Sequence, residues 1–198
     1  MTVPFEPDTP ARERLTGLAR DAIRHAAGDG PAPELLAEAE PAPLNAPGAS
    51  FVTLKCGGEL RGCIGSLEAR RPLAEDVLHN AVAAATRDPR FPPLTAPELA
   101  GLEYSVTLLG PSEPLEATSR HTLLDRLRPR EDGLILQAGP RRATFLPAVW
   151  ESLPDPEAFV DALLRKAGLP CHPWPEGLQA WRYGSLELAG RMETRNDS

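Results

Sequence analysis

The chain has 198 residues, of which 41% are hydrophobic and 25% are charged. This composition is typical of a globular protein with a sizeable core, and it excludes an intrinsically disordered chain. The formal net charge of -7 disfavours a general nucleic-acid binder, because contacts to phosphates need a surplus of Lys and Arg.

The N-terminus and the cysteines give expectations about location. Residues 1–8 contain no basic region followed by an apolar run, so we expect no signal peptide. No stretch approaches the roughly 18 apolar residues that a membrane-spanning helix needs. Cys56, Cys63 and Cys171 are too few and odd in number for a disulfide framework, which suits a reducing compartment. We therefore expect a cytoplasmic protein with no membrane partner.

The first part of the chain predicts one helix and a long connection. Asp8, Thr9 and Pro10 are typical of a helix start, and apolar residues then recur at helical spacing as far as Gly28. Residues 29–48 are rich in Pro, Ala and Glu, which predicts a surface connection with one helical turn around residues 34–38.

A hairpin is predicted to lead into a cysteine turn. Apolar and polar residues alternate over residues 51–55, and Gly57 and Gly58 favour a tight reversal into residues 59–61. The segment Arg61-Gly62-Cys63-Ile64-Gly65 follows at once. Its glycines predict left-handed or closely approaching backbone, so we expect a turn that presents the Cys63 thiol.

The rest of the chain predicts alternating helices and strands. The pattern first predicts a helix opening at Pro72 and ending near Arg87, a rigid loop at 88–93, a capped turn at 95–99 and a strand at 102–109. It then predicts a helix at 118–127 and a hairpin of strands 134–137 and 142–145. A helix at 156–167 and a last strand pair within 178–188 complete the prediction. Such hairpins interspersed with helices predict an α+β fold, in which an antiparallel or mixed sheet of hairpins has helices packed around it.

Cys63 is the first candidate for chemistry. Consecutive backbone N–H groups in a glycine-rich turn form an anion-binding nest, and Arg61 adds a permanent positive charge. Both effects favour the thiolate, which is the nucleophilic form of cysteine. The alternative is that Cys63 only fills a small space in the core, since free cysteine is among the most buried residue types.

Further candidates lie in or beside the predicted rigid turns. Asp88 or Glu103 would act as an acid or base, Arg61, Arg90 and Arg142 would clamp an anionic substrate, and Gly62 and Gly65 would let the substrate approach the backbone. The alternative for each charged residue is a structural ion pair that holds a loop to the sheet.

Neither a metal nor a cofactor is predicted. Cys56, Cys63, Cys171 and His172 lack the Cys-x-x-Cys spacing of zinc sites. The glycines at 57, 58 and 62 are not followed by the lysine of a phosphate-binding loop.

The hairpin and the cysteine segment resemble the AMMECR domain family. The resemblance rests on Phe51-Val52-Thr53-Leu54-Lys55, Leu60-Arg61-Gly62-Cys63-Ile64-Gly65-Ser66, Asp88-Pro89-Arg90-Phe91, Pro93-Leu94, Glu98-Leu99, Asp132-Gly133-Leu134-Ile135-Leu136, Arg141-Arg142, Thr144-Phe145-Leu146-Pro147, Trp150-Glu151 and Lys166-Ala167-Gly168-Leu169. The chain departs from the family pattern at Thr86-Arg87, where an aromatic residue is common, and at Ala143, where glycine is usual.

This resemblance implies one AMMECR-type domain over residues 9–188, with a division into a large and a small subdomain left open. It implies a compact α+β fold with an antiparallel sheet and a cleft lined by the cysteine segment. It also implies partners, because bacterial and archaeal members look linked to Memo-like proteins and radical S-adenosylmethionine enzymes, whereas eukaryotic relatives lean towards protein interaction.

Three functional hypotheses follow. In the first, the chain is an enzyme or a component of an enzyme system that uses Cys63. In the second, it is a non-catalytic module that binds a partner through surface residues around Phe91 or Trp150. In the third, its arginines bind RNA, which would make binding strongly dependent on salt.

Overall fold

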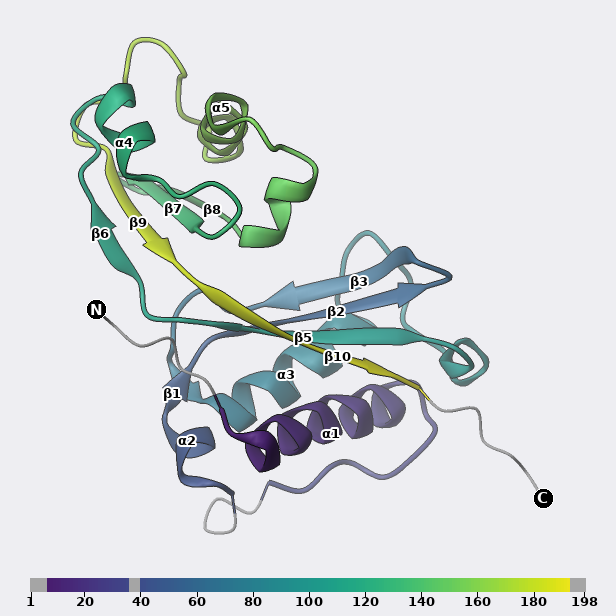
Figure 1. Ribbon diagram of the computed structural model, residues 1–198. Coiled ribbons are helices and arrows are strands. Elements are labelled where there is room, and N and C mark those ends of the chain that lie inside the picture. The colour runs from purple at the N-terminus through teal and green to yellow at the C-terminus, as the bar shows by residue number, and fades with distance from the viewer. Residues whose placement is uncertain (1–6, 36–39, 193–198) are drawn as a thin grey trace. The chain divides into compact units, whose positions relative to one another are not determined.

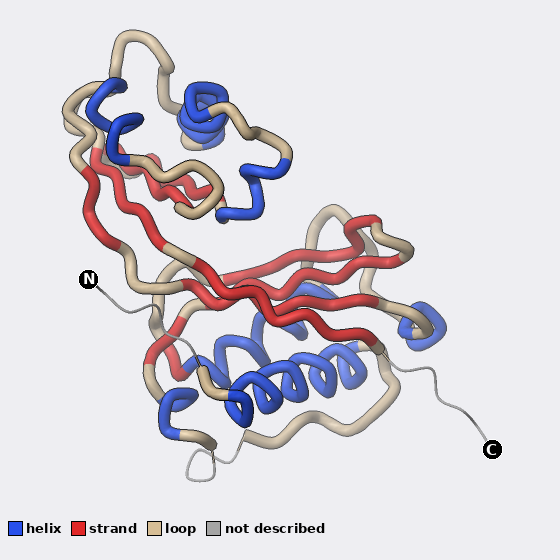
Figure 2. The backbone as a smooth tube through the Cα atoms, viewed as in Figure 1, coloured by secondary structure: helices blue, strands red, loops and turns tan. Residues whose placement is uncertain are grey.

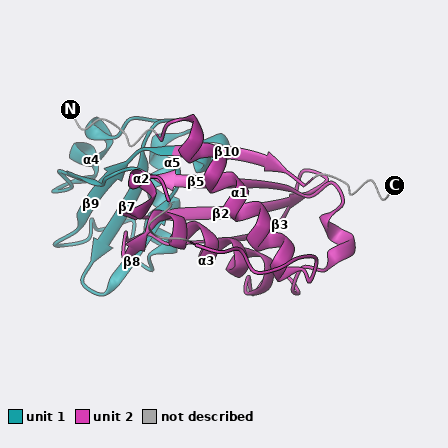
Figure 3. Cartoon of the chain, turned by 90° about the horizontal axis from the view of Figure 1, so that it is seen from below, with its two compact units in different colours: residues 1–4, 110–185 teal, residues 5–109, 186–198 magenta. Residues whose placement is uncertain are grey.

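The computed structural model describes residues 7–35 and 40–192, which form two compact units (Figure 3). Unit 1 is Gly110–Ser185. Unit 2 contains the described residues up to Leu109 together with those from Leu186 onward. The chain therefore leaves unit 2 after Leu109 and returns to it at Leu186.

Unit 2 is a four-stranded sheet with helices on one face (Figures 1 and 2). The strand order is β10 (Ser185–Arg191), β5 (Glu103–Leu109), β2 (Ser50–Cys56) and β3 (Glu59–Gly65), and β2 is antiparallel to both of its neighbours. The other elements are α1 (Thr9–Ala26), α2 (Ala42–Asn45), β1 (Pro47–Gly48), β4 (Arg71–Pro72), α3 (Leu73–Thr86) and the 3-10 helix η1 (Ala96–Leu99).

The predicted first helix is confirmed as α1. The side chain of Asp8 accepts a hydrogen bond from the backbone N–H of Ala11 at 3.0 Å and so caps the first turn. Leu15, Leu18 and Ala22 form part of the buried stripe that packs on the sheet. In the connection that follows, residues 34 and 35 are not helical, residues 36–39 lie outside the described residues, and a short helix occurs at α2 instead.

Alternation along β2 defines two faces of the sheet. Ser50, Val52 and Leu54 are buried, and the apolar pair belongs to the core made with α1 and α3. The intervening side chains point to the opposite face, because successive side chains of a strand alternate. We call this the outer face of unit 2, and it carries Thr53 and Lys55.

Unit 1 has its own sheet and core. Its strand order is β6 (Glu113–Leu115), β9 (Gln179–Tyr183), β7 (Gly133–Ala138) and β8 (Arg141–Phe145), accompanied by α4 (Arg120–Arg126), η2 (Pro147–Glu151) and α5 (Pro156–Lys166). The predicted hairpin of residues 134–137 and 142–145 is confirmed as β7 and β8, and the helices predicted at 118–127 and 156–167 are confirmed as α4 and α5. The predicted α+β class is thus correct for both units.

Trp150 is a core residue of unit 1. Its ring stacks on Phe159 with centroids 3.7 Å apart, its side chain nitrogen donates to the carbonyl of Asp132, and it is 2% exposed. The Trp150 ring itself is therefore not accessible to a partner, and the expected partner surface around Phe91 or Trp150 stays a prediction.

The predicted last strand pair is also wrong. Both strands exist, but β9 pairs with β6 and β7, whereas β10 lies beside β5 in the other sheet. Gly184 alone separates Tyr183 from Ser185, and one residue cannot make the two-residue reversal of a tight hairpin. The chain therefore continues from one sheet into the next.

The cysteine segment is a strand and not a turn. Cys63 lies in β3 opposite Thr53, and the tight reversal is at Gly57 and Gly58, whose φ angles are +59° and +85°. Gly62 instead allows close packing, because a Cβ there would lie 2.3 Å from the carbonyl oxygen of Ala84 in α3. Similarly, a Cβ at Gly65 would lie 2.2 Å from the ring of Phe51. The left-handed alternative for these two glycines is overturned, and the close-approach alternative holds.

A buried carboxylate ties α3 to the sheet. Asp76 is fully buried and accepts hydrogen bonds from Ser50 Oγ at 2.8 Å, Asn80 Nδ2 at 2.9 Å and Ser66 Oγ at 2.8 Å. Because Ser66 follows β3 directly and Ser50 begins β2, this network sets the start of α3 against both strands.

We predict that Gly62→Ala destabilises the protein by about 1 to 3 kcal/mol, because the clash is with backbone that cannot move aside. Urea denaturation measures the difference. Gly17→Ala is the matched control, since its nearest neighbouring atom would be 4.0 Å away in α1. There the same substitution should stabilise by about 0.5 to 1 kcal/mol. A Gly62→Ala protein as stable as the wild type would contradict the close packing of α3 on β3.

Candidate functional site

The loop after α3 covers the free edge of the sheet. β3 is an edge strand, and its Cys63 backbone N–H donates to Asp88 Oδ2 at 2.8 Å. The side chain of Arg61 donates to the carbonyl of Pro92 at 3.0 Å. An edge strand whose N–H groups find partners within the chain is protected from pairing with another molecule. The proline-rich loop is therefore attached to the cysteine strand at two points.

Asp88 is an anchor for this loop. It is 4% exposed, and Arg90 grips it through two hydrogen bonds, from Nε to Oδ1 at 2.9 Å and from Nη2 to Oδ2 at 2.7 Å. These bonds, helped by the backbone N–H groups of Cys63 and Arg90, hold the pKa of Asp88 well below its usual range. The carboxylate is thus charged and fully occupied at neutral pH.

Arg61 is committed to a second ion pair. Its Nε donates to Glu98 Oε1 at 2.8 Å, and this bond is the main cause that lowers the pKa of Glu98 to about 2. Thr95 also donates to Glu98 and completes a capping box at the start of η1. The Arg61 side chain is only 12% exposed.

Phe91 lies between the two arginines of this loop region. The guanidinium carbon of Arg61 is 5.7 Å from the centroid of the Phe91 ring, and that of Arg90 is 5.6 Å from it. Both distances are within the range of cation–π attraction. The Phe91 ring therefore adds cation–π contacts to the two ion pairs of this region.

Cys63 itself is half-buried on the outer face of unit 2. Its Sγ accepts a hydrogen bond from Thr53 Oγ1 at 3.3 Å, across the β2–β3 ladder. The pKa of Arg90 is raised, chiefly by its hydrogen bond to Asp88. Asp88 also accepts the Cys63 N–H, so it joins Arg90 to the cysteine strand, and the Arg90 side chain is 53% exposed.

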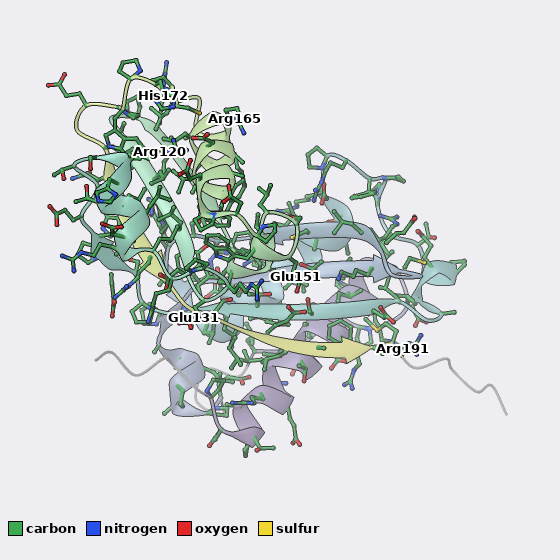
Figure 4. The ribbon with its side chains drawn as sticks, turned by 45° about the horizontal axis from the view of Figure 1, so that its top comes forward. Arg120, Glu131, Glu151, Arg165, His172 and Arg191 are labelled. Atoms are coloured by element: carbon green, nitrogen blue, oxygen red, sulfur yellow. The ribbon has the colours of Figure 1, made fainter. Side chains whose placement is uncertain are left out.

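A pocket of about 420 Å³ lies on the same outer face. It is lined by residues of β2, β5 and β10, namely Thr53, Lys55, Glu103, Tyr104, Ser105, Glu187, Ala189, Gly190 and Arg191. Arg191 marks the end of β10 in Figure 4, and its Nη2 is 3.6 Å from Glu103 Oε1. Thr53 connects the pocket to the cysteine, because its hydroxyl group also binds Cys63 Sγ.

The predicted site residues fall into three groups. Cys63, Asp88 and Arg90 are brought together at the edge strand, with Arg61 next to them through the loop. Glu103 is two strands away from β3 and lines the pocket. Arg142 lies on β8 in unit 1, opposite Gln137, and is outside the group described in unit 2.

Sequence reasoning missed Thr53 as a contact of the sulfur. The signal was present, because Thr53 occupies an outward position of an alternating strand. Its partner was hidden, since the cysteine segment was expected to be a turn. The pocket residues of β10 were missed for another reason: nothing local to residues 185–191 indicates that they lie beside β5.

A metal centre has no support among the described residues. They contain no group of three or more His, Cys, Asp or Glu side chains that could hold a metal ion.

None of the helices in residues 7–35 and 40–192 has the length and apolar character needed to cross a membrane.

Comparison with known proteins identifies the family. The AMMECR1 family model matches residues 16–188, which is most of the chain. The chain belongs to the AMMECR1 family. The expected resemblance and its α+β fold are thereby confirmed.

Other AMMECR1 relatives are found in archaea. The chain is 35% identical to the protein MJ0810 of Methanocaldococcus jannaschii over 83% of each chain. It is 42% identical to a protein of Thermofilum pendens, with 66% of this chain and 58% of the relative covered. A Methanothermobacter thermautotrophicus relative, also 42% identical, is covered over 63% of its length. The chain therefore spans less than two thirds of these last two relatives.

A solved structure shares the fold. The crystal structure of the uncharacterized protein PH0010 from Pyrococcus horikoshii superposes with a TM-score of 0.82 at 30% identity. The match covers 92% of this chain and 93% of PH0010. The fold is thus shared with a solved structure over nearly the whole of both chains.

We predict that the Arg61–Glu98 pair stabilises the protein above about pH 4.5 and ceases to do so in strong acid. The pKa of Glu98 is lowered from 4.5 to about 2, so its contribution is present above 4.5 and is lost as the pH falls through about 2. Wild type should therefore exceed Glu98→Gln in urea resistance at pH 6, and the difference should shrink between pH 4.5 and 2. Other acidic groups titrate in both proteins and cancel.

Glu75→Gln is the control for this titration, since Glu75 is an exposed residue of α3. Its stability relative to wild type should not follow the same pH profile. A Glu98→Gln difference that is unchanged at pH 2.5 would show that the ion pair does not hold the loop.

Proposed function

We propose that this AMMECR1 protein is an enzyme, or a component of an enzyme system, in which Cys63 acts as a nucleophile on a substrate that carries an anionic group. The observation that supports this best is the position of Cys63, whose Sγ is half-buried on the outer face beside the Thr53 hydroxyl and whose N–H shares Asp88 with Arg90. A thiol used only for packing would not need a hydrogen-bond donor, or a half-exposed cation held next to its strand.

The two arginines of this region have different proposed roles, one in fixing the loop and one in binding the substrate anion. Arg90 is 53% exposed at its side chain, so it has surface left for an anion, whereas Arg61 is 12% exposed and bound to Glu98. We assign the anion clamp to Arg90 and the fixing of the loop to Arg61. Gly62 and Gly65 contribute by letting α3 and Phe51 pack against β3.

Glu103 is the better candidate for proton transfer. Asp88 is occupied by Arg90 and by the Cys63 amide, and its low pKa makes it a poor base. Glu103 lies in the pocket, with the 71% exposed Arg191 as its ion-pair partner. In the proposed step, the Glu103 carboxylate accepts the thiol proton of Cys63, and Sγ forms a bond to an electrophilic carbon of the substrate. The leaving group departs with its bonding pair and takes the proton back from Glu103.

We predict that Cys63 reacts with anionic reagents with help from Arg90. Iodoacetate and iodoacetamide form the same kind of bond, but only iodoacetate is charged. The ratio of their rates at Cys63 should fall about two- to fivefold in Arg90→Gln, which is the size of an exposed charge interaction. Mass spectrometry of the native protein measures both rates.

Cys56 is an internal control in the same experiment, because it is exposed at the end of β2 and its rate ratio should not respond to Arg90→Gln. Reaction of Cys63 only after denaturation would instead establish it as a packing residue. Loss of the in vivo function in Cys63→Ser, with the fold unchanged by circular dichroism, would support catalysis.

We further propose that the enzyme system includes a Memo-like protein and a radical S-adenosylmethionine enzyme, which would bind at the loop around Phe91. This loop is fixed by Asp88 and Arg61, and a rigid surface loses little entropy on association. Phe91 is half-buried and flanked by two arginines, a residue combination that is frequent in interface hot spots.

We predict that Phe91→Ala weakens a pull-down of these partners at least about tenfold, whereas Cys63→Ser leaves it unchanged. Leu60→Ala is the control, since Leu60 is an exposed apolar residue of β3 outside this loop. Equal capture by Phe91→Ala and wild type would remove the loop from the interface, and no capture of either partner would remove the proposed system.

A further inference from the structure

We propose that the outer-face pocket of unit 2 binds a short peptide with free ends, with its ammonium group at Glu187 and its carboxylate at Lys55. The inference rests on the proposed function in one respect, because it supplies the class of substrate for Cys63. The pocket is described by side chains of unit 2 alone.

Small residues make the floor of the pocket. Thr53 and Ser105 face each other across β2 and β5. The backbone bond from Met192 to Leu102 and the Arg191–Glu103 pair place Ala189 of β10 beside Ser105. A row of Thr, Ser and Ala leaves a hollow between larger side chains, and the two hydroxyl groups supply hydrogen-bonding capacity for a polar ligand.

Charges of both signs stand around this floor. Lys55, Glu103 and Arg191 lie at one end of the three strands, and Glu187 lies towards the other end on β10. Glu103 and Arg191 are partners of each other. Lys55 and Glu187 are exposed and have no ion-pair partner among the residues that the structure describes. These two opposite charges are therefore available to a ligand.

The mixture of positive and negative side chains around the pocket disfavours a ligand that carries charges of only one sign. A polyanion would meet Glu103 and Glu187, a polyamine would meet Lys55 and Arg191, and like charges in contact are unfavourable. An apolar ligand would leave the hydroxyl and charged groups without water or partners. A ligand with separated positive and negative ends satisfies both free charges at once.

The separation of the free charges fits a peptide of about three residues. Lys55 and Glu187 lie two strands and four residues apart, so their Cα atoms are about 16 Å from each other. When both side chains extend towards each other, roughly 10 Å separates the charged groups. An extended peptide of three residues spans roughly 10 Å.

The carboxylate end of this peptide would lie nearest the cysteine. Lys55 is two residues from Thr53 on β2, and Thr53 donates its hydroxyl hydrogen to Cys63 Sγ. Because Lys55 and Thr53 share the outer face, a carboxylate held by Lys55 lies on the same face of the sheet as the sulfur. This agrees with a substrate whose anionic group is near the reacting carbon.

The test measures binding of the tripeptide Ala-Ala-Ala to the Cys63→Ser protein by isothermal titration calorimetry, so that no chemistry intervenes. N-acetyl-Ala-Ala-Ala and Ala-Ala-Ala-amide each lack one charge and should bind about tenfold more weakly than the free peptide. Glu187→Gln should abolish the preference for a free amino end and keep the preference for a free carboxylate. Lys55→Gln should do the reverse, and Glu75→Gln should change neither.

Several results would overturn the proposal. It fails if Ala-Ala-Ala does not bind at millimolar concentration, or if the end preferences survive in Glu187→Gln and Lys55→Gln. It also fails if the bound peptide leaves alkylation of wild-type Cys63 by iodoacetamide unslowed relative to Cys56. Alkylation of Cys63 without peptide tests the proposed function separately. A reactive Cys63 in a protein that binds no peptide would therefore contradict the peptide proposal and leave the proposed function of Cys63 standing.

Discussion

The close approach of α3 to the cysteine strand is the constraint on which unit 2 depends. Only a residue without a Cβ fits at position 62, because the Ala84 carbonyl oxygen occupies that space. The approach places the end of α3 beside β3, so the loop that follows begins within reach of the edge strand. Asp88 then accepts the Cys63 N–H, and the Asp76 network holds the other end of the helix. The packing of α3 on β3 therefore brings Asp88 and Asp76 within hydrogen-bonding distance of their partners.

Two ion pairs fix the loop, and their arginines differ in how much of the side chain is exposed to solvent. The Arg61–Glu98 pair sits at η1 with the arginine largely covered, while Arg90 holds a buried Asp88 and keeps half of its own surface exposed. Since a buried carboxylate needs its partners, Asp88 is bound to a structural role. The half-exposed Arg90, the Thr53 hydroxyl and the pocket beyond it are the groups on which the proposed chemistry on the outer face rests.

Local patterns predicted the elements well and the pairing of strands less well. The capped α1, the Gly57-Gly58 reversal and the β7–β8 hairpin depend on neighbours in the chain, so they were correctly predicted. The last strand pair failed because β9 and β10 each find partners far away in sequence. The cysteine segment failed for a related reason: glycine permits either a turn or close packing, and only the position of α3 decides between them.

By its sequence alone this protein is determined as an α+β member of the AMMECR1 family with a notable cysteine segment, since periodicity, capping and motif order are local properties. The tertiary structure decided which candidates lie close together in unit 2. It joined Cys63 to Asp88 and Arg90, set Glu103 in a pocket with the returning strand β10, and left Arg142 in unit 1. The physical reason is that hydrogen bonds and charge contacts depend on separation in space, which long-range packing sets and residue order does not.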